Sequence, residues 1–304
     1  MRTKINLFIC LLLGFVGFAQ QDAQYTQYMY NTANVNPAYT GSRGVLSVFG
    51  LHRTQWVGLD GAPVTNTFAI STPIENTRLG VGLSFVNDRI GPTVENKISG
   101  DVSYTVPTSE TYKLSFGIKG SVNLFSFDRN LLNIYNTNDV NLQSIDNDLR
   151  PNVGAGLYLH SDKTYIGLSV PNFLQTTIYT DLNDRAIYME RMHAYLIGGH
   201  VFDLSSSVKF KPSFLLKGVQ GAPLQLDLSG NFMFNDKFVL GAAWRWSAAV
   251  SAMAGFQATP GLYIGYGYDL ETTKLADYNS GSHEIFLRFE LFKRTDRIIS
   301  PRFF

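Results

Sequence analysis

Residues 113–124 read Lys-Leu-Ser-Phe-Gly-Ile-Lys-Gly-Ser-Val-Asn-Leu, so apolar side chains alternate with polar ones or glycine. Successive side chains of a β-strand point to opposite faces, and this stretch therefore predicts a strand with one apolar and one polar face. Four more stretches alternate as cleanly, at 97–106, 208–217, 224–234 and 284–291. Weaker matches fill the rest of the chain, at 44–54, 64–73, 79–87, 151–160, 163–170, 192–202, 237–247, 250–258 and 261–270.

The composition narrows the class of protein. The 304 residues include 25 basic and 24 acidic side chains, and charged residues make up 16% of the chain, against roughly 25% in an ordinary soluble protein. Aromatic residues reach 13% and the mean hydropathy is −0.02. The chain is too apolar for disorder, has no basic excess for binding nucleic acid, and is too polar on average for a bundle of membrane helices.

An antiparallel transmembrane β-barrel of about 14 strands fits these observations, because half of each strand in such a barrel is apolar and half is polar. No segment after residue 19 shows a convincing helical period or 18 consecutive apolar residues. A soluble secreted β-sandwich is the alternative, but its outer face would carry more charge.

The predicted connections alternate in length, which orients the barrel. Connections after even-numbered strands are short: 75–78, 107–111, 161–162, 203–206, 235–236 and 259–260. Those after most odd-numbered strands are longer: 55–63, 88–95, 128–150, 171–190 and 271–282, whereas 217–223 and 247–249 are exceptions. Outer-membrane barrels have short periplasmic turns and long extracellular loops, so we expect both ends of the barrel sequence in the periplasm.

The start of the chain predicts secretion. Residues 1–19 combine Arg2 and Lys4 with an apolar run and small residues before Gln20, as a cleaved signal peptide does. An uncleaved N-terminal anchor is the alternative. Cys10, the one cysteine, lies in this run, so the mature chain would contain no thiol. We therefore expect a signal peptide at 1–19, a periplasmic or lumenal segment at 20–43, an outer-membrane barrel at 44–293 and a periplasmic tail at 294–304.

The alternation also assigns the two faces of the barrel wall. The apolar set should contact lipid and the polar set should face the lumen. The polar set carries both signs of charge, which predicts a wet interior or one crossed by ion pairs. It consists of Lys97, Asp101, Lys113, Lys119, Lys209, Lys211, Asp227, Lys237, Arg245, Asp269, Glu284, Arg288 and Glu290. Aromatic residues suited to the membrane interfaces are Tyr104, Trp244, Trp246, Tyr266 and Tyr268.

No catalytic motif stands out. The five histidines form no spaced metal motif, and neither a nucleophile elbow nor a phosphate-binding loop occurs. We therefore expect no enzyme activity, no cofactor and no metal site.

The remaining motifs predict contacts with a partner. Arg53 and Trp56 lie at the first outer loop, and both residue types are common at interface hot spots. Asp88, Arg89 and Pro92 belong to the predicted second outer loop. Asn36, Pro37 and Tyr39 lie in the segment 22–41, which is too polar and aromatic for a lipid-facing strand. That segment could lie in the barrel mouth, bind a periplasmic partner, or form only an ordered turn before the first strand.

These motifs together resemble the PorP/SprF family. The resemblance covers the whole mature chain and rests on the runs at 24–31, 36–39, 52–58 with 61–63, 86–92, 167–172, 279–284 and 300–304. It implies an outer-membrane component of the type IX secretion system of Bacteroidota. It also implies, as partners, other components of that system and the C-terminal secretion domain of an exported surface protein, including gliding adhesins.

Two functions follow from these observations. In the first, the barrel is an anchor or shuttle that binds one secreted partner at its outer loops or mouth. In the second, it is a passive channel for small solutes, which would conduct ions in a planar bilayer. The resemblance favours the first, and a 14-stranded barrel is wide enough for either.

Overall fold

The computed structural model describes residues 24–132, 144–175, 177–179, 186–189 and 191–291. The predicted signal peptide at 1–19 and tail at 294–304 lie outside these residues and stay predictions. Within the described part of the chain, no helix is both long and apolar enough to cross a membrane.

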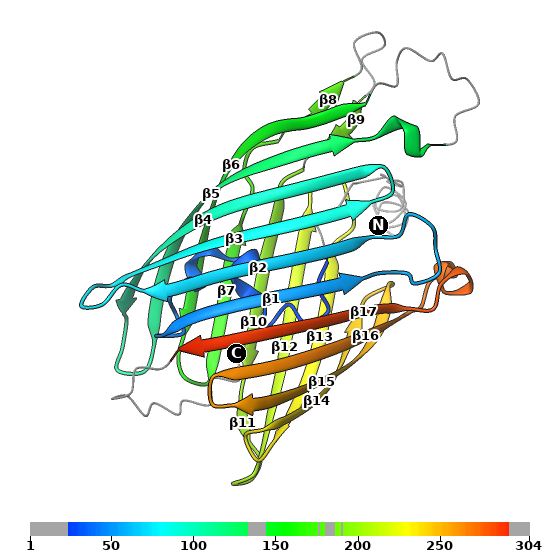
Figure 1. Cartoon of the computed structure of the whole chain (residues 1–304). Coiled ribbons are helices and arrows are strands. Elements are labelled where there is room, and N and C mark those ends of the chain that lie inside the picture. The colour runs from blue at the N-terminus through cyan, green and yellow to red at the C-terminus, as the bar shows by residue number, and fades with distance from the viewer. Residues whose placement is uncertain (1–23, 133–143, 176, 180–185, 190, 292–304) are drawn as a thin grey trace, which may run out of the picture.

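One antiparallel sheet curls round and closes on itself (Figure 1). Its first half contains β1 (Leu46–Thr54), β2 (Val64–Pro73), β3 (Leu79–Ile90), β4 (Thr93–Pro107), β5 (Lys113–Phe127), β6 (Ile145–His160) and β7 (Thr164–Val170). Its second half contains β10 (His193–His200), β11 (Phe202–Asp203), β12 (Val208–Val219), β13 (Gln225–Phe234), β14 (Phe238–Arg245), β15 (Ala249–Thr259), β16 (Leu262–Glu271) and β17 (Ser282–Leu291).

Two pairings close the ring. β1 pairs with β17 over nine residues, and β10 joins β7 to β12. β10 and β11 both pair with β12 and are separated only at Val201, so they form one interrupted strand. Counted in this way, the ring has 14 strands. Closure leaves no free sheet edge, which is the condition for a sheet to stand in hydrocarbon. The predicted all-β barrel is confirmed.

Every predicted strand is present, with its ends shifted by a few residues. The predicted long loop 88–95 is wrong, because β3 and β4 continue to a tight turn at Gly91 and Pro92. Gly91 has φ of 53°, a left-handed conformation that reverses the chain in two residues. The loop predicted at 128–150 is also shorter, since β6 begins at Ile145. A small hairpin, β8 (Thr177–Tyr179) with β9 (Ala186–Met189), lies in the connection between β7 and β10.

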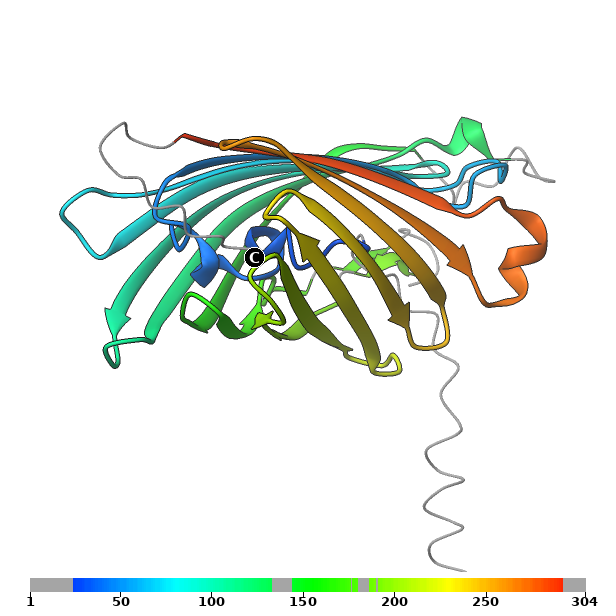
Figure 2. The same ribbon diagram turned by 90° about the horizontal axis from the view of Figure 1, so that it is seen from below.

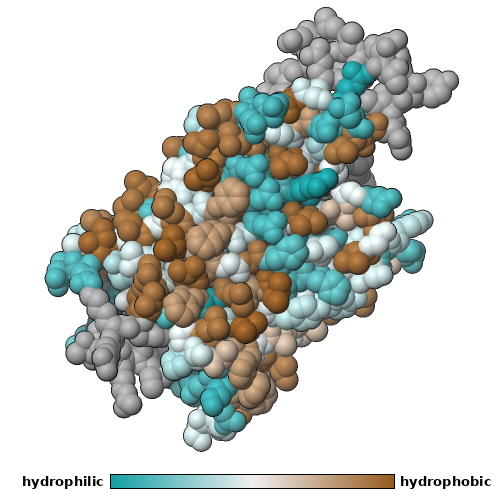
Figure 3. Space-filling view, in the orientation of Figure 1, coloured by the Kyte–Doolittle hydropathy of each residue, from teal (hydrophilic) through white to brown (hydrophobic). Residues whose placement is uncertain are grey.

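The outside of the barrel is apolar. Figure 3 shows a belt of hydrophobic side chains across the strands, with hydrophilic residues along one side of it. On β4 and β5, Ile98, Val102 and Ile118 are exposed, whereas the neighbouring Asp101 and Lys119 are buried inward. On these two strands the lipid-facing and lumen-facing sets lie as the alternation predicts, whereas Lys113 and Lys237 of the predicted lumenal set are exposed beside short turns.

A row of hydrogen-bonded polar side chains limits this belt on β1 to β4. His52 Nδ1 lies 2.8 Å from Asn66 Oδ1, Asn66 donates to Asn87 over 3.3 Å, and Asn87 donates to Asn96 over 2.8 Å. These side chains point outward on neighbouring strands, on the side of the belt toward the long loops. Polar residues satisfied in this way suit the membrane surface, so the hairpin beyond Asn87 and Asn96 projects out of the belt.

The prediction of a purely polar lumen needs correction. Inward positions also carry large apolar and aromatic side chains, which form one buried cluster with residues of the N-terminal segment. Those from the wall include Phe49, Leu51, Tyr158, Ile197, Met233, Tyr263 and Phe286. The reason is that the lumen holds protein: Figure 2 shows the N-terminal segment, with α2 (Thr32–Val35) and η1 (Pro37–Tyr39), inside the ring of strands. The other short helices, η2 (Arg129–Leu131) and η3 (Lys274–Tyr278), lie in loops.

A charge placed in the middle of the apolar belt should destabilise the barrel. Ile118 is 65% exposed on the outer face of β5, and Ile118→Arg should cost about 2–4 kcal/mol of unfolding free energy in a bilayer. Urea unfolding in lipid vesicles, followed by the heat-dependent mobility of the folded barrel on gels, measures this. Glu110→Arg in the turn between β4 and β5 is the control and should change little. Equal stability of the two variants would contradict the placement of Ile118 in lipid.

Candidate functional site

The described N-terminal residues 24–43 form a plug that runs the length of the lumen. At one end, Gln24 donates to Gln225 at the long-loop end of β13 over 2.8 Å. Midway, the hydroxyl of Tyr28 lies 3.2 Å from that of Ser229. At the other end, Arg43 forms an ion pair with Glu290, beside the short turns where β1 begins. The described part of the N-terminal segment, 24–43, therefore lies in the lumen.

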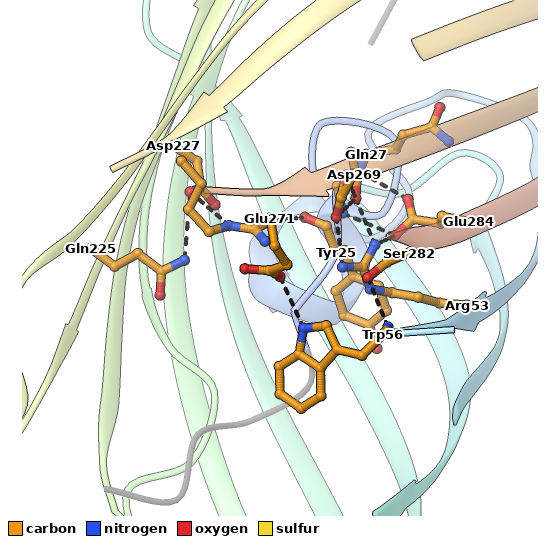
Figure 4. A network of polar contacts seen from close by, with 12 residues as sticks. Tyr25, Gln27, Arg53, Trp56, Gln225, Asp227, Asp269, Glu271, Ser282 and Glu284 are labelled. Atoms are coloured by element: carbon orange, nitrogen blue, oxygen red, sulfur yellow. Dashed lines mark hydrogen bonds and ion pairs between the residues drawn. The ribbon is translucent and has the colours of Figure 1, made fainter. Parts of the chain in front are cut away.

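Five residues, which we call the anchor cluster, fasten the plug to the barrel wall: Thr26, Gln27, Arg53, Asp269 and Glu284. The carboxylate of Glu284 accepts hydrogen bonds from the backbone N–H groups of Thr26 and Gln27, each over 2.9 Å. The hydroxyl of Thr26 donates to Asp269 over 2.7 Å. Arg53 donates to Asp269 over 2.7 Å, to Glu284 over 3.2 Å and to the Thr26 hydroxyl over 2.6 Å. Figure 4 shows these groups converging from three strands and the plug.

The anchor cluster crosses the seam that closes the barrel. Arg53 on β1 and Glu284 on β17 are direct partners in the register of the first and last strands, and Asp269 lies on β16. All three side chains are at most 2% exposed. Buried charges require partners, and here each carboxylate has both the guanidinium and a donor from the plug. Plug binding and seam closure thus use the same groups.

A second polar group lies beside the anchor cluster at the mouth. Arg245 on β14 donates to Asp227 on β13 over 3.0 Å and to the backbone oxygen of Tyr25 over 3.3 Å. The Trp56 indole donates to Glu271 over 2.9 Å. The start of the plug is therefore held by β13 and β14 as well as by β1, β16 and β17 (Figure 4).

Aromatic and cationic side chains pack round the middle of the plug. The ring of Tyr30 lies 5.5 Å from that of Tyr263 and 5.0 Å from that of Phe286, measured between centroids. The Lys211 ammonium lies 4.8 Å from the centroid of Tyr30, a cation–π arrangement.

Glycines in the wall make room for the lower part of the plug. A Cβ atom at Gly117 on β5 would lie 2.2 Å from the backbone nitrogen of Ala38, and one at Gly156 on β6 would lie 2.1 Å from Asn36 Oδ1. The Asn36 side chain donates to the backbone oxygen of Leu157 over 2.9 Å and accepts from the N–H of Ala38 over 2.9 Å. The plug thus sits directly on the backbone of β5 and β6.

The long loops join into a continuous structure at the mouth, which we call the outer rim: 55–63, 91–92, 128–132 and 272–281. Val57 N–H donates to Gly281 and Ser280 N–H donates to Val57, over 2.9 and 2.8 Å. Gly91 N–H donates to Gly61 over 2.8 Å, and Asp128 N–H donates to Pro92 over 2.9 Å. Trp56 has φ of 46°, an uncommon value for a bulky residue, and is held there by these contacts and its bond to Glu271.

The structure separates the predicted contact residues into two groups. Asn36, Pro37 and Tyr39 are buried in the plug, and Arg53 is buried in the anchor cluster rather than lying in an external loop. Trp56 and Pro92 lie in the outer rim. Asp88 and Arg89 are not in a loop but in β3, where Asp88 accepts a hydrogen bond from Thr65 over 2.6 Å and Arg89 is exposed. A role for any of them in partner binding stays a prediction.

The sequence did not reveal how the anchor cluster is assembled. Asp269 and Glu284 were predicted to face the lumen, but their meeting with Arg53 depends on which strands become neighbours at closure. Nothing local in the sequence sets Gly117 and Gly156 apart from other strand glycines. Within the described residues, no three His, Cys, Asp or Glu side chains are grouped so that they could hold a metal ion.

A closed 14-stranded barrel with an apolar belt and an internal plug is an outer-membrane protein. Residues 17–289 match the family described as "Type IX secretion system membrane protein PorP/SprF". The chain belongs to this family, as the sequence motifs predict. No curated protein matches the sequence.

Solved outer-membrane proteins share the fold. The toluene transporter TbuX of Ralstonia pickettii superposes with a TM-score of 0.51 at 8% identity, over 85% of this chain and 92% of its own. A FadL homologue of Pseudomonas aeruginosa gives 0.48 at 12%, covering 86% and 94% of the two chains. Omp33 of Acinetobacter baumannii gives 0.45 at 10%, covering 82% and 100%. At such identities the likeness concerns the fold alone.

Removing the cation of the anchor cluster should strongly destabilise the protein. Arg53→Met leaves two buried carboxylates without their guanidinium, which should cost about 3–5 kcal/mol. The urea midpoint of the folded barrel in vesicles measures the loss. Combining Arg53→Met with Asp269→Asn and Glu284→Gln removes the uncompensated charge and should restore part of the stability. A triple variant less stable than Arg53→Met would contradict this account.

A side chain at Gly117 should displace the lower part of the plug. Gly117→Val places atoms where the backbone of residues 37–38 lies, and overpacking of this kind costs about 1–3 kcal/mol or more. We expect a higher single-channel conductance in planar bilayers than for the unaltered protein. Gly120→Val on the same strand meets nothing within 4 Å of its Cβ and is the control. Unchanged conductance of a folded Gly117→Val variant would contradict the seating of the plug.

Proposed function

We propose that this type IX secretion family barrel holds a secreted partner protein at the cell surface by binding the partner's C-terminal domain at the outer rim. The observation that carries the proposal is the plug. The lumen contains the protein's own N-terminal segment, packed against strands around the ring and fastened at both ends. A barrel filled in this way is better suited to binding at its mouth than to passing solutes.

The outer rim supports the proposal because it is ordered and partly apolar. Its loops are hydrogen-bonded to each other, so they present a defined surface. Large apolar residues are exposed there, outside the polar row that limits the belt on β1 to β4, namely Leu59, Leu131, Leu132 and Tyr278. Exposed apolar groups outside lipid are typical of protein interaction sites. A gliding adhesin is one class of partner that the family resemblance suggests.

The proposal is tested by purifying the tagged protein from outer membranes and identifying the chains bound to it. Deleting the gene should remove one large protein from the cell surface while other type IX cargo still leaves the cell. Normal display of all cargo in the deletion strain would overturn the proposal. The alternative, a passive channel, predicts steady conductance from the unaltered protein in planar bilayers, and the plug counts against it.

Substitutions in the outer rim and at the adjoining end of β3 should release the partner without unfolding the barrel. Arg89 is exposed on β3, on the long-loop side of the polar row that contains Asn87. Tyr278 is 71% exposed in the loop between β16 and β17. Arg89→Ala combined with Tyr278→Ala should weaken partner binding about tenfold or more, as loss of interface anchors does. The fraction of partner that co-purifies measures this. Leu204→Ala, at a 57% exposed residue in a short turn, is the matched control. Full recovery of the partner with the double variant would rule out this face.

A further inference from the structure

The path of the plug fixes the end of the barrel at which its first described residue, Gln24, lies. β1 begins at the short-turn end of the barrel, and the plug reaches it from within the lumen through Arg43. Toward the N-terminus, the residues of the plug contact wall residues that lie nearer to the long-loop end of the barrel. Thr40 accepts a hydrogen bond from Ser103 near the end of β4, whereas Thr26 contacts Glu284 near the start of β17.

The first described residues lie at the opposite end. Gln24 contacts Gln225, the first residue of β13, and the backbone oxygen of Tyr25 accepts from Arg245, the last residue of β14. Both wall residues flank loops of the long-loop end. The N-terminal end of the plug and the start of β1 are therefore separated by the whole height of the barrel.

We infer that the plug crosses the membrane inside the barrel and presents its N-terminal end, at Gln24, to the outside of the cell. The described part of the chain then crosses the membrane an odd number of times, once as the plug and 14 times as strands. Of the periplasmic or lumenal position expected for residues 20–43, the inference takes the lumenal one for residues 24–43 and extends it to the outer mouth. It also adds Gln24 and Tyr25 to the surface that a partner at the outer mouth would meet, although the inference does not depend on such a partner.

The contacts near Gln24 favour a plug that stays in this position. Thr26 and Gln27, directly after Tyr25, each give a backbone N–H to the same buried carboxylate. Charge-assisted hydrogen bonds of this kind are roughly twice as strong as neutral ones. Gln24 itself is only partly buried, so its side chain can be replaced without opening the anchor cluster.

Cysteine labelling on intact cells tests the inference. The single cysteine of the sequence, Cys10, lies in the predicted signal peptide, so an introduced cysteine is the one thiol of the mature chain. Three variants are compared: Gln24→Cys, Asp60→Cys in the first long loop and Glu110→Cys in a short turn. The reagent is a polyethylene-glycol maleimide too large to pass the outer membrane. Heat-dependent gel mobility shows that each variant is folded.

We expect Gln24→Cys to be labelled on intact cells to the extent of Asp60→Cys, while Glu110→Cys reacts only after the outer membrane is opened. Labelling of Gln24→Cys together with Glu110→Cys, or only after unfolding, would overturn the inference. If Asp60→Cys and Glu110→Cys exchange their behaviour, the orientation is reversed and the exterior position of Gln24 is overturned with it. Loss of a co-purified partner plays no part in these outcomes, so the proposed function stands or falls separately.

Discussion

The pairing of β1 with β17 is the constraint on which the rest of the structure depends. In hydrocarbon every backbone N–H and C=O must find its partner within the protein, and a sheet achieves this only by closing on itself. Here closure joins residues more than two hundred positions apart in the sequence, and the Arg53–Glu284 pair lies across that seam. The Glu284 carboxylate also accepts hydrogen bonds from the backbone of the plug, so closure of the wall and filling of the lumen depend on one set of charges.

Filling the lumen changes what the inner wall must contain. An empty pore would be lined with polar groups in water. Here the inner wall contacts a folded segment, and the residue type at each level of the wall suits the part of the plug that it contacts. Glycines at 117 and 156 lie under the plug backbone, aromatic side chains surround Tyr30, and ion pairs occupy the level of the mouth. The outer rim does not depend on an open lumen. Its loops are hydrogen-bonded to one another and therefore present a surface at the mouth while the plug occupies the lumen.

The strands could be predicted from the sequence because alternation is a local signal, and the segments at 64–73 and 113–124 contain it in full. Predictions that relied on loops were less reliable. Residues 88–95 look like a loop by composition, yet Asp88 and Arg89 extend β3, because the register with β2 and β4 continues past the membrane surface. Phe49 and Phe286 point into the lumen, which the assumption of a polar interior excluded. Their position depends on the plug, a contact between segments far apart in the chain.

By itself, the sequence determined the class of protein: strands of membrane-spanning length, an apolar outer face, alternating connections, and motifs that place the chain in the PorP/SprF family. Tertiary structure decided where the N-terminal segment lies, which charges meet, and that Arg53 serves the interior and not an outer loop. The physical reason is that side-chain alternation depends on neighbours in the chain, whereas burial of a charge or a tyrosine depends on what closure brings opposite it.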